Sequence, residues 1–299
     1  EAMPEPATFR GLPIIDTMIG FPLYDKRAAY ADLVQKTSDR SDADAGGFPV
    51  DYAFKAVPGE VPPGTDQVAY TLDAMDRHGI VLGLVMIDSD DYDGGAALDA
   101  YRRHPDRFVA SIDVDPGEGP GALTRLERFH ADAGIRAVGI FPAGCVPQIP
   151  INHRTLYPVY ARCVELDLPV FVCAGIPGPR MPGLGQYVGL IDDVLCEFPD
   201  LVFVTRHGCE PWEELAVALM RKHPNLHYST SAFAPRHYPR AIVDFANDGG
   251  ADQVIYAGYF PMGLSLERIV RDFASVPFAD DVWPKFLYGN AARVLRVAP

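Results

Sequence analysis

The segment that decides the fold is Leu201-Val-Phe-Val-Thr-Arg-His207-Gly-Cys-Glu-Pro-Trp212. It begins with an almost unbroken apolar run, which is typical of a strand buried on both faces of a parallel sheet. A glycine and a proline follow at once, as they do where a strand leads into a helix start. We therefore predict a parallel sheet in which His207 lies at the C-terminal end of a buried strand.

Seven other segments resemble this one and alternate with helical stretches. Strands are predicted at 13–19, 81–87, 108–114, 137–141, 169–173, 201–205, 226–230 and 253–257, and helices at 66–78, 121–133, 156–166, 184–198, 212–223 and 236–247. Eight strands and their helices over about 250 residues predict an α/β protein of the (β/α)8 TIM-barrel type. A doubly wound sheet is the alternative, although no Gly-x-Gly-x-x-Gly follows the first strand.

Two segments depart from a minimal barrel. Residues 21–65 form a long insertion after the first strand, and such loops usually serve as lids or binding elements. We expect this insertion to lie over the barrel mouth with Phe21, Tyr24, Phe48 and Phe54 around the site; a dimer interface is the alternative. Residues 280–297 are predicted to be a helical extension. Because no linker divides the chain, residues 1–299 are expected to form a single domain.

Composition restricts the partners. The formal net charge of −14 argues against nucleic acid, since phosphate binding needs a basic face. No apolar run approaches the roughly 18 residues that a membrane span requires. The five cysteines form no Cys-x-x-Cys pair, which favours reduced core thiols, and the first residues lack the features of a secretion signal. We expect a cytoplasmic protein that binds neither nucleic acid nor membranes, and we leave open a homodimer.

Three strand ends and the C-terminus carry a family resemblance. The quoted stretches are Asp16-Thr-Met18-Ile-Gly20, His207-Gly208, Ala257-Gly-Tyr259-Phe-Pro261 and Tyr288-Gly-Asn-Ala-Ala-Arg-Val-Leu295. They resemble the amidohydrolase superfamily, in particular the amidohydrolase-related branch with decarboxylases of the aminocarboxymuconate-semialdehyde and resorcylate type. Members of that family begin with an Asp-x-His-x-His strand, carry histidines on the fifth and sixth strands, and end with Gly-Thr/Ser-Asp-x-Pro on the eighth.

The same resemblance indicates that the family's metal site is degraded. Met18 and Gly20 stand at the histidine positions of the first motif, Cys173 at the fifth-strand histidine and Tyr259 at the aspartate, whereas His207 is retained. A catalytic divalent ion needs about three protein ligands, and thioether and phenol are poor ligands for zinc. We therefore expect no metal and no other cofactor.

The C-terminal ends of barrel strands supply the candidate site residues. The catalytic candidates are His207 as general base, Tyr259 as hydrogen-bond donor to an oxyanion, Asp16 in the barrel floor, and Cys173 as either a core thiol or a nucleophile. The expected substrate-binding residues are Met18, Phe21, Phe141, Arg206, Trp212 and Arg236. For Arg206 and Arg236, a solvated salt bridge is the alternative to binding an anionic group.

Three functions remain open. The first, which the sequence favours, is metal-independent hydrolysis of a small ester, thioester or lactone, with an acyl-CoA or another activated acyl group as substrate. The second is decarboxylation or a related C–C lyase reaction, as the resemblance implies, although those reactions lean on a metal. The third is a non-catalytic barrel that binds a ligand.

Overall fold

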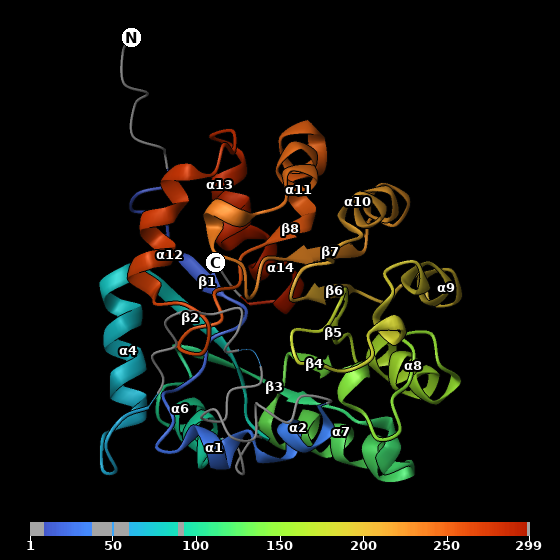
Figure 1. Ribbon diagram of the computed structural model, residues 1–299, viewed down its shortest axis with the longest axis horizontal. Helices are drawn as coiled ribbons and strands as arrows, with labels where there is room; N and C mark the ends of the chain where they lie inside the picture. Colours follow the sequence, from blue (N-terminus) through green and yellow to red (C-terminus); the bar gives the residue numbers. More distant parts are fainter. Residues whose placement is uncertain (1–8, 38–49, 51–59, 89–92, 298–299) are drawn as a thin grey trace.

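The computed structural model describes residues 9–37, 50, 60–88 and 93–297 (Figure 1). Its strands form one parallel sheet in which each strand pairs with the next along the chain. The strands are β1 (Ile14–Asp16), β2 (Ile80–Met86), β3 (Phe108–Asp113), β4 (Ala137–Ile140), β5 (Val170–Cys173), β6 (Phe203–Arg206), β7 (Leu226–Ser229) and β8 (Val254–Ile255).

The sheet closes on itself just beyond β8 and β1. The Tyr259 N–H donates to the Met18 carbonyl at 2.9 Å, the Gly20 N–H donates to the Phe260 carbonyl at 2.8 Å, and Ile19 and Phe260 form a parallel bridge. The predicted barrel is thereby confirmed. The doubly wound alternative is wrong, because that fold requires a reversal of strand order that this sheet lacks.

Helices surround the strands on the outside of the ring (Figure 1). The main ones are α4 (Gln67–His78), α6 (Ala96–Arg103), α7 (Pro120–Ala133), α8 (Tyr157–Glu165), α9 (Leu190–Glu197), α10 (Glu213–Lys222), α11 (Arg240–Phe245) and α12 (Leu266–Asp272). The helix predicted at 184–198 begins only at Leu190, since the three glycines at 183, 185 and 189 leave its first residues as the 3-10 turn η4 (Leu184–Gln186) and a loop. None of the described helices is long and apolar enough to cross a bilayer.

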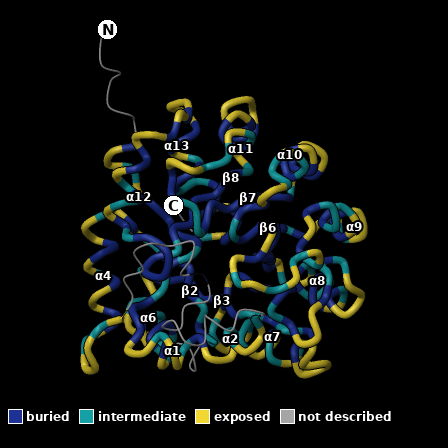
Figure 2. The backbone as a smooth tube through the Cα atoms, viewed as in Figure 1, coloured by how far each residue is buried: buried dark blue, intermediate teal, exposed yellow. Residues whose placement is uncertain are grey.

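Alternation along the strands divides the core into two layers. Residues that point outward pack under the helices, whereas those that point inward fill the barrel. The inner cluster contains Ile15, Leu84, Val109, Ala137, Phe171, Val204 and Ile255, together with Ala291, Ala292, Val294 and Leu295 of α14 (Asn290–Leu295). The strands are accordingly buried in Figure 2, and the outer faces of the helices are exposed. The C-terminal helix thus packs on the apolar half of the barrel interior, and the polar half lies toward the C-terminal strand ends.

The insertion at 21–65 and the C-terminal extension at 280–297 both contain only short helices in the described residues. The described part of the insertion contains α1 (Lys26–Ala29) and α2 (Ala31–Lys36), and Lys36 Nζ donates to the Gly144 carbonyl, just beyond β4, at 2.9 Å. Phe21 is buried, and Tyr24 is exposed with its hydroxyl on the Thr65 carbonyl. Phe48 and Phe54 lie outside the described residues. The predicted helical extension is three short pieces, α13 (Val282–Pro284), the π-helical η9 (Lys285–Gly289) and α14.

Candidate active site

A cavity of about 1130 Å³ opens at the C-terminal ends of the strands. Eight residues predicted from the sequence line it: Met18, Phe21, Phe141, Cys173, Arg206, His207, Arg236 and Tyr259. Tyr30, Leu33 and Val50 of the insertion also line it, so part of that segment borders the site. Most of the wall is apolar, and its charged members therefore determine what the cavity can bind.

An ion pair between the buried Arg206 and the partly exposed Asp113 lies on the floor of the cavity. The Nη1 of Arg206 lies 3.1 Å from Oδ1 and 3.3 Å from Oδ2 of Asp113. Arg206 is only 9% exposed, whereas the Asp113 side chain keeps 35% of its surface. Arg206 follows the inward Val204 by two residues on β6, which places it in the barrel interior. Arg206 thus forms a salt bridge, the alternative considered for it, but with its own side chain buried rather than solvated.

Arg206 and Asp113 can contact each other because Gly139, which lies between them, has no side chain. This residue lies on β4, where it is the register partner of Asp113, and on β5 Cys173 is the register partner of Arg206. The guanidinium thus reaches from β6 past β5 and β4 to β3. A Cβ on Gly139 would lie 1.8 Å from Asp113 Oδ1 and 2.5 Å from Arg206 Nη2, so any side chain there would exclude the pair.

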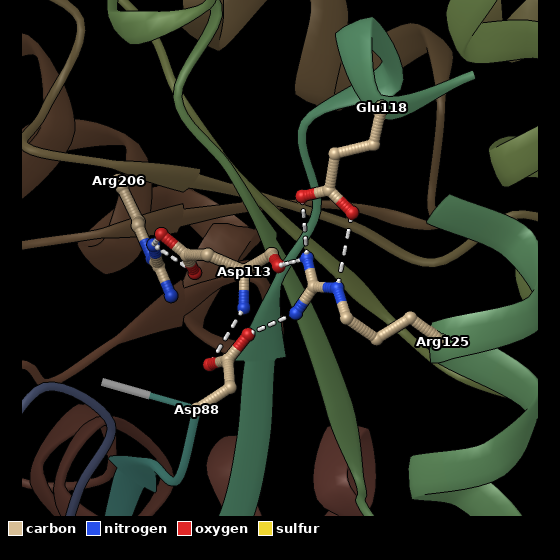
Figure 3. Close-up of polar contacts among 5 residues, drawn as sticks. All are labelled: Asp88, Asp113, Glu118, Arg125 and Arg206. Carbon is tan, nitrogen blue, oxygen red and sulfur yellow. Dashed lines mark hydrogen bonds and ion pairs between the residues drawn. The ribbon is translucent and has the colours of Figure 1, made fainter. Parts of the chain in front are cut away.

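A second arginine fixes Asp113 from outside the barrel (Figure 3). Arg125 on α7 forms ion pairs with Asp88, at the end of β2, and with Glu118 of η1 (Pro116–Glu118), and its Nη2 donates to the Asp113 carbonyl at 2.7 Å. The Asp113 N–H donates to Asp88 Oδ1 at 3.2 Å. The backbone of Asp113 is held by this network, whereas its carboxylate is held by Arg206.

Three residues on the cavity wall adopt left-handed backbone conformations. His207, Ala232 and Tyr259 have φ values of 60°, 72° and 70°. Such conformations cost non-glycine residues of the order of 1–3 kcal/mol, and they cluster at functional sites. The rings of His207 and Tyr259 meet edge to face at 5.1 Å between centroids. The backbone N–H of His207 donates to Ser231 Oγ at 2.8 Å. The backbone is thus strained where the retained family histidine enters the cavity.

Burial makes the histidine and the cysteine poor groups for activating water or attacking a substrate. Burial and the neighbouring Arg206 lower the pKa of His207 to about 3, so the imidazole is neutral and only weakly basic at pH 7. Burial raises the pKa of the Cys173 thiol to about 12, so little thiolate is present. Burial also raises the pKa of Tyr259 above its ordinary range, and its hydroxyl stays a donor.

Two predicted site residues do not line the cavity. Asp16 is fully buried beneath it, where Oδ1 accepts from the N–H groups of Met18 and Gly258, both at 2.9 Å, and joins β1 to the chain beyond β8. Burial raises the pKa of Asp16 to about 7. Trp212 packs edge to face on Tyr187 at 5.0 Å between centroids.

The strand ends do not fit a catalytic metal ion. Among the described residues of the cavity wall, the family's ligand positions offer one imidazole, one protonated thiol, a thioether and a phenol. The guanidinium of Arg206 adds a buried positive charge that would repel a cation. Within the described chain, one group of metal-binding side chains lies close together, Asp192, Cys196 and His223, but it is not part of the cavity and Asp192 is paired with Lys222.

We expect the variant Cys173→Ala to retain turnover within about threefold of the wild type, because a thiol that stays protonated contributes packing rather than attack. Steady-state assays with any substrate that the wild type turns over would test this. A thiol-directed reagent should label the exposed Cys196 and leave Cys173 unmodified in the folded protein. Loss of activity in Cys173→Ala together with a covalent substrate adduct on Cys173 would contradict the expectation.

The comparisons with known proteins agree with this architecture. A family model described as amidohydrolase matches residues 25–297. An uncharacterized TIM-barrel protein from Bordetella bronchiseptica is similar, at 22% identity and a TM-score of 0.70 over 95% of this chain and 99% of that one. No curated protein matches the chain in sequence.

Two solved decarboxylases share the fold. The 2,6-dihydroxybenzoate decarboxylase from Rhizobium has 14% identity and a TM-score of 0.64, over 96% of this chain and 99% of that one. The 5-carboxyvanillate decarboxylase from Novosphingobium aromaticivorans, solved with manganese, has 15% identity and a TM-score of 0.63, over 96% of this chain and 97% of that one. At these identities the likeness concerns the fold alone.

Proposed function

The chain belongs to the amidohydrolase family, and on that premise we propose that it decarboxylates an organic acid in the cavity at the barrel mouth without a metal ion. The observation that carries this proposal is the buried guanidinium of Arg206 on the floor of a mostly apolar cavity. A buried cation of this kind binds a carboxylate through charge-assisted hydrogen bonds. Decarboxylation is also the reaction of two proteins that share the fold.

The apolar wall supports the same reaction. A carboxylate that exchanges CO2 for a proton changes from an anion into a neutral molecule, so surroundings of low polarity favour the products over the bound acid. The cavity volume of about 1130 Å³ lies above the roughly 300–1,000 Å³ typical of small-molecule sites. We therefore expect the acid to carry an apolar body larger than a single ring.

In this proposal Arg206 supplies the fixed positive charge for which relatives of the decarboxylase branch use a metal ion. A guanidinium remains protonated at every physiological pH and presents several N–H donors in one plane. Arg206 Nε is buried and has no hydrogen-bond partner among the described residues, so the hydrogen-bonding capacity of the guanidinium is not fully used within the protein. Tyr259 is the second donor of the site, for an oxygen of the substrate that gains negative charge.

Hydrolysis of an activated acyl group, which the sequence favours, is the second candidate. The edge-to-face arrangement of His207 and Tyr259 would suit it, with one ring orienting water and the other polarising a carbonyl. It requires a base, however, and His207 with a pKa of about 3 is a weak one. We therefore place hydrolysis after decarboxylation.

The products distinguish these reactions. The purified protein would be incubated with a panel of hydroxylated and unsaturated carboxylic acids bearing apolar substituents, and separately with lactones, thioesters and esters. We expect CO2 release from at least one acid, detected by coupled assay and by mass spectrometry of the shortened product. New carboxylic acids formed from the acyl panel, with no CO2 from the acids, would favour hydrolysis instead.

Removal of any bound metal tests whether Arg206, rather than a metal ion, supplies the positive charge of the site. We expect dialysis against a strong chelator to leave the rate of decarboxylation and the melting temperature unchanged, because the described residues of the cavity wall do not supply the ligands that would hold an ion. Elemental analysis of the untreated protein should find no stoichiometric zinc, manganese or iron. A manganese-containing decarboxylase treated in parallel is the control. One equivalent of metal per chain whose removal abolishes turnover would contradict the prediction.

A further inference from the structure

We propose that Asp113 donates the proton that replaces CO2, and that the substrate prepares it by taking the place of Asp113 on Arg206. This inference rests on the proposed decarboxylation, which needs a proton donor at the carbon that loses CO2. Tyr259 stands where the family motif has its eighth-strand aspartate, and its raised pKa makes it a poor donor of a whole proton. Asp113 is not at any position of the family motifs and lies on the same cavity.

The geometry makes Asp113 the exchangeable member of the ion pair. Arg206 is nearly buried, whereas the Asp113 carboxylate faces the cavity with 35% of its side-chain surface exposed. In the described part of the chain its hydrogen bonds come from a single Arg206 nitrogen, Nη1. A substrate carboxylate that enters the cavity can therefore bind Arg206 and separate it from Asp113 without moving the backbone of β3, which Asp88 and Arg125 hold.

The surrounding charges determine what Asp113 does when it loses Arg206. The charged and titratable groups around it are Asp88, Arg125, Glu118, Arg206, Cys173 and Cys145, with Asp115 and Lys36 beyond Cys145. Arg125 is already paired with Asp88 and Glu118. The remaining effect on Asp113 is that of the Asp88 carboxylate.

Asp88 accepts a hydrogen bond from the backbone N–H of Asp113, so two acidic residues lie beside one another, and neighbouring like charges favour the uptake of one proton. Burial and the charge of Asp113 already raise the pKa of Asp88 to about 6. Asp88 keeps its ion pair with Arg125, whereas Asp113 has lost its guanidinium once the substrate is bound, and we therefore assign the proton to Asp113. Binding of the acid thus converts Asp113 from a counterion into a carboxylic acid beside the substrate.

The cycle balances in charge and in atoms. The substrate carboxylate binds Arg206, and Asp113 takes one proton from solvent. The C–C bond to the carboxylate then breaks, the carbon keeps its electron pair and forms a C–H bond with the proton of Asp113, and CO2 leaves. Asp113 becomes anionic again as the substrate carboxylate disappears, so Arg206 has one anionic partner at every stage and is never a buried charge without one.

Proton uptake tests this exchange directly. Benzoate serves as the probe, and its binding is measured by calorimetry at pH 7 in buffers of different ionisation enthalpy. We expect the wild type to take up close to one proton per benzoate, so its affinity should fall as the pH rises. Asp113→Asn should bind benzoate at least as tightly, because the competing carboxylate is gone, but should take up no proton. Asp113→Glu should retain the uptake, and it also serves if the asparagine variant does not fold.

Two outcomes would overturn the inference. One is benzoate binding to the wild type without proton uptake; the other is uptake that persists in Asp113→Asn. Asp88→Asn and His207→Gln examine the other candidate acceptors, Asp88 with its pKa of about 6 and the imidazole of His207: proton uptake in both variants should match that of the wild type, and loss of uptake in either would assign the proton to that residue instead. These results do not depend on turnover, so a protein that takes up the proton but releases no CO2 from any acid would contradict the proposed function alone.

Turnover supplies the second measurement. Once an acid that releases CO2 is known, Asp113→Asn should lower kcat by roughly 10²-fold, the usual contribution of a positioned proton donor, with little change in KM. Asp113→Glu should recover part of the loss. An asparagine variant with wild-type kcat would overturn the role of Asp113 even if decarboxylation itself is established.

Discussion

Replacement of Arg206 by methionine is expected to abolish benzoate binding and to lower kcat/KM for decarboxylation by about 10³-fold or more. Loss of one partner of a buried, hydrogen-bonded charge pair costs roughly 2–5 kcal/mol, and each 1.4 kcal/mol is a factor of ten. Methionine keeps the length and apolar stem of the side chain, so the change removes the charge and the N–H donors rather than the packing. Calorimetry with benzoate and a CO2-release assay measure the two effects.

Arg240→Met is the matched control for this substitution. Arg240 lies at the start of α11, its side chain is 92% exposed, and it pairs with the exposed Asp244 outside the cavity wall. Its loss should leave both measurements unchanged. The melting temperature of Arg206→Met should fall only slightly, because the Asp113 carboxylate that it leaves behind still reaches solvent. If benzoate affinity survives in Arg206→Met, the anion binds at another cation of the cavity wall, such as Arg236 or Arg268.

The fold could be predicted from the sequence because each strand is a local signal. Segments such as 201–205 and 170–173 carry continuous apolar runs, and such runs need no knowledge of distant residues. The strand bounds accordingly lie within a few residues of those predicted. The helix expected at 184–198 shows the limit of this reasoning, since its apolar residues fit a helix while its glycines favour turns.

The candidate site was only partly predictable, for two physical reasons. Alternation along β6 places Arg206 inside the barrel, but its partner on β3 depends on the register between strands and on the missing side chain of Gly139. A local sequence pattern shows neither the register between the strands nor the contact that the missing side chain of Gly139 allows. The motifs indicate that metal ligands are replaced at Met18 and Cys173; they do not indicate that a guanidinium has entered the space between the strands. Asp113 follows an apolar strand like many other aspartates, so its sequence context gives no sign of a proton donor.

Backbone conformation was the other missing signal. His207 and Tyr259 occupy a region of φ that non-glycine residues seldom adopt, and nothing in the residue types requires it. A glycine stands beside each of these residues, Gly208 after His207 and Gly258 before Tyr259. The strained conformations nevertheless fall on His207 and Tyr259, whose side chains line the cavity. The structure therefore adds to the family resemblance a reason to regard these two positions as functional: strain of this kind persists only where the surroundings hold it in place.

The strongest purely steric prediction concerns Gly139. In Gly139→Ala the added methyl group would lie 1.8 Å from Asp113 Oδ1 and 2.5 and 2.7 Å from the two terminal nitrogens of Arg206, so the ion pair must separate. A displacement of about 1 Å at a reacting group can cost roughly 10²-fold in rate. Because this change disturbs the anion site and the proton donor together, we expect kcat/KM to fall by between about 10²- and 10³-fold.

Two further variants separate this effect from general damage to the barrel. Gly121→Ala, in the first turn of α7, adds the same methyl group where no atom lies within 4 Å, so it should leave activity unchanged and raise the melting temperature slightly. In the double variant Gly139→Ala/Asp113→Ala the methyl group occupies space that the carboxylate has left. The methyl group still lies 2.5 and 2.7 Å from the terminal nitrogens of Arg206, so benzoate affinity should recover only if the guanidinium shifts into the vacated space, while proton uptake and turnover stay lost. If Gly139→Ala alone keeps full benzoate affinity and turnover, the pair of Arg206 and Asp113 is not where the substrate binds, and the charge that anchors it must lie elsewhere on the cavity wall.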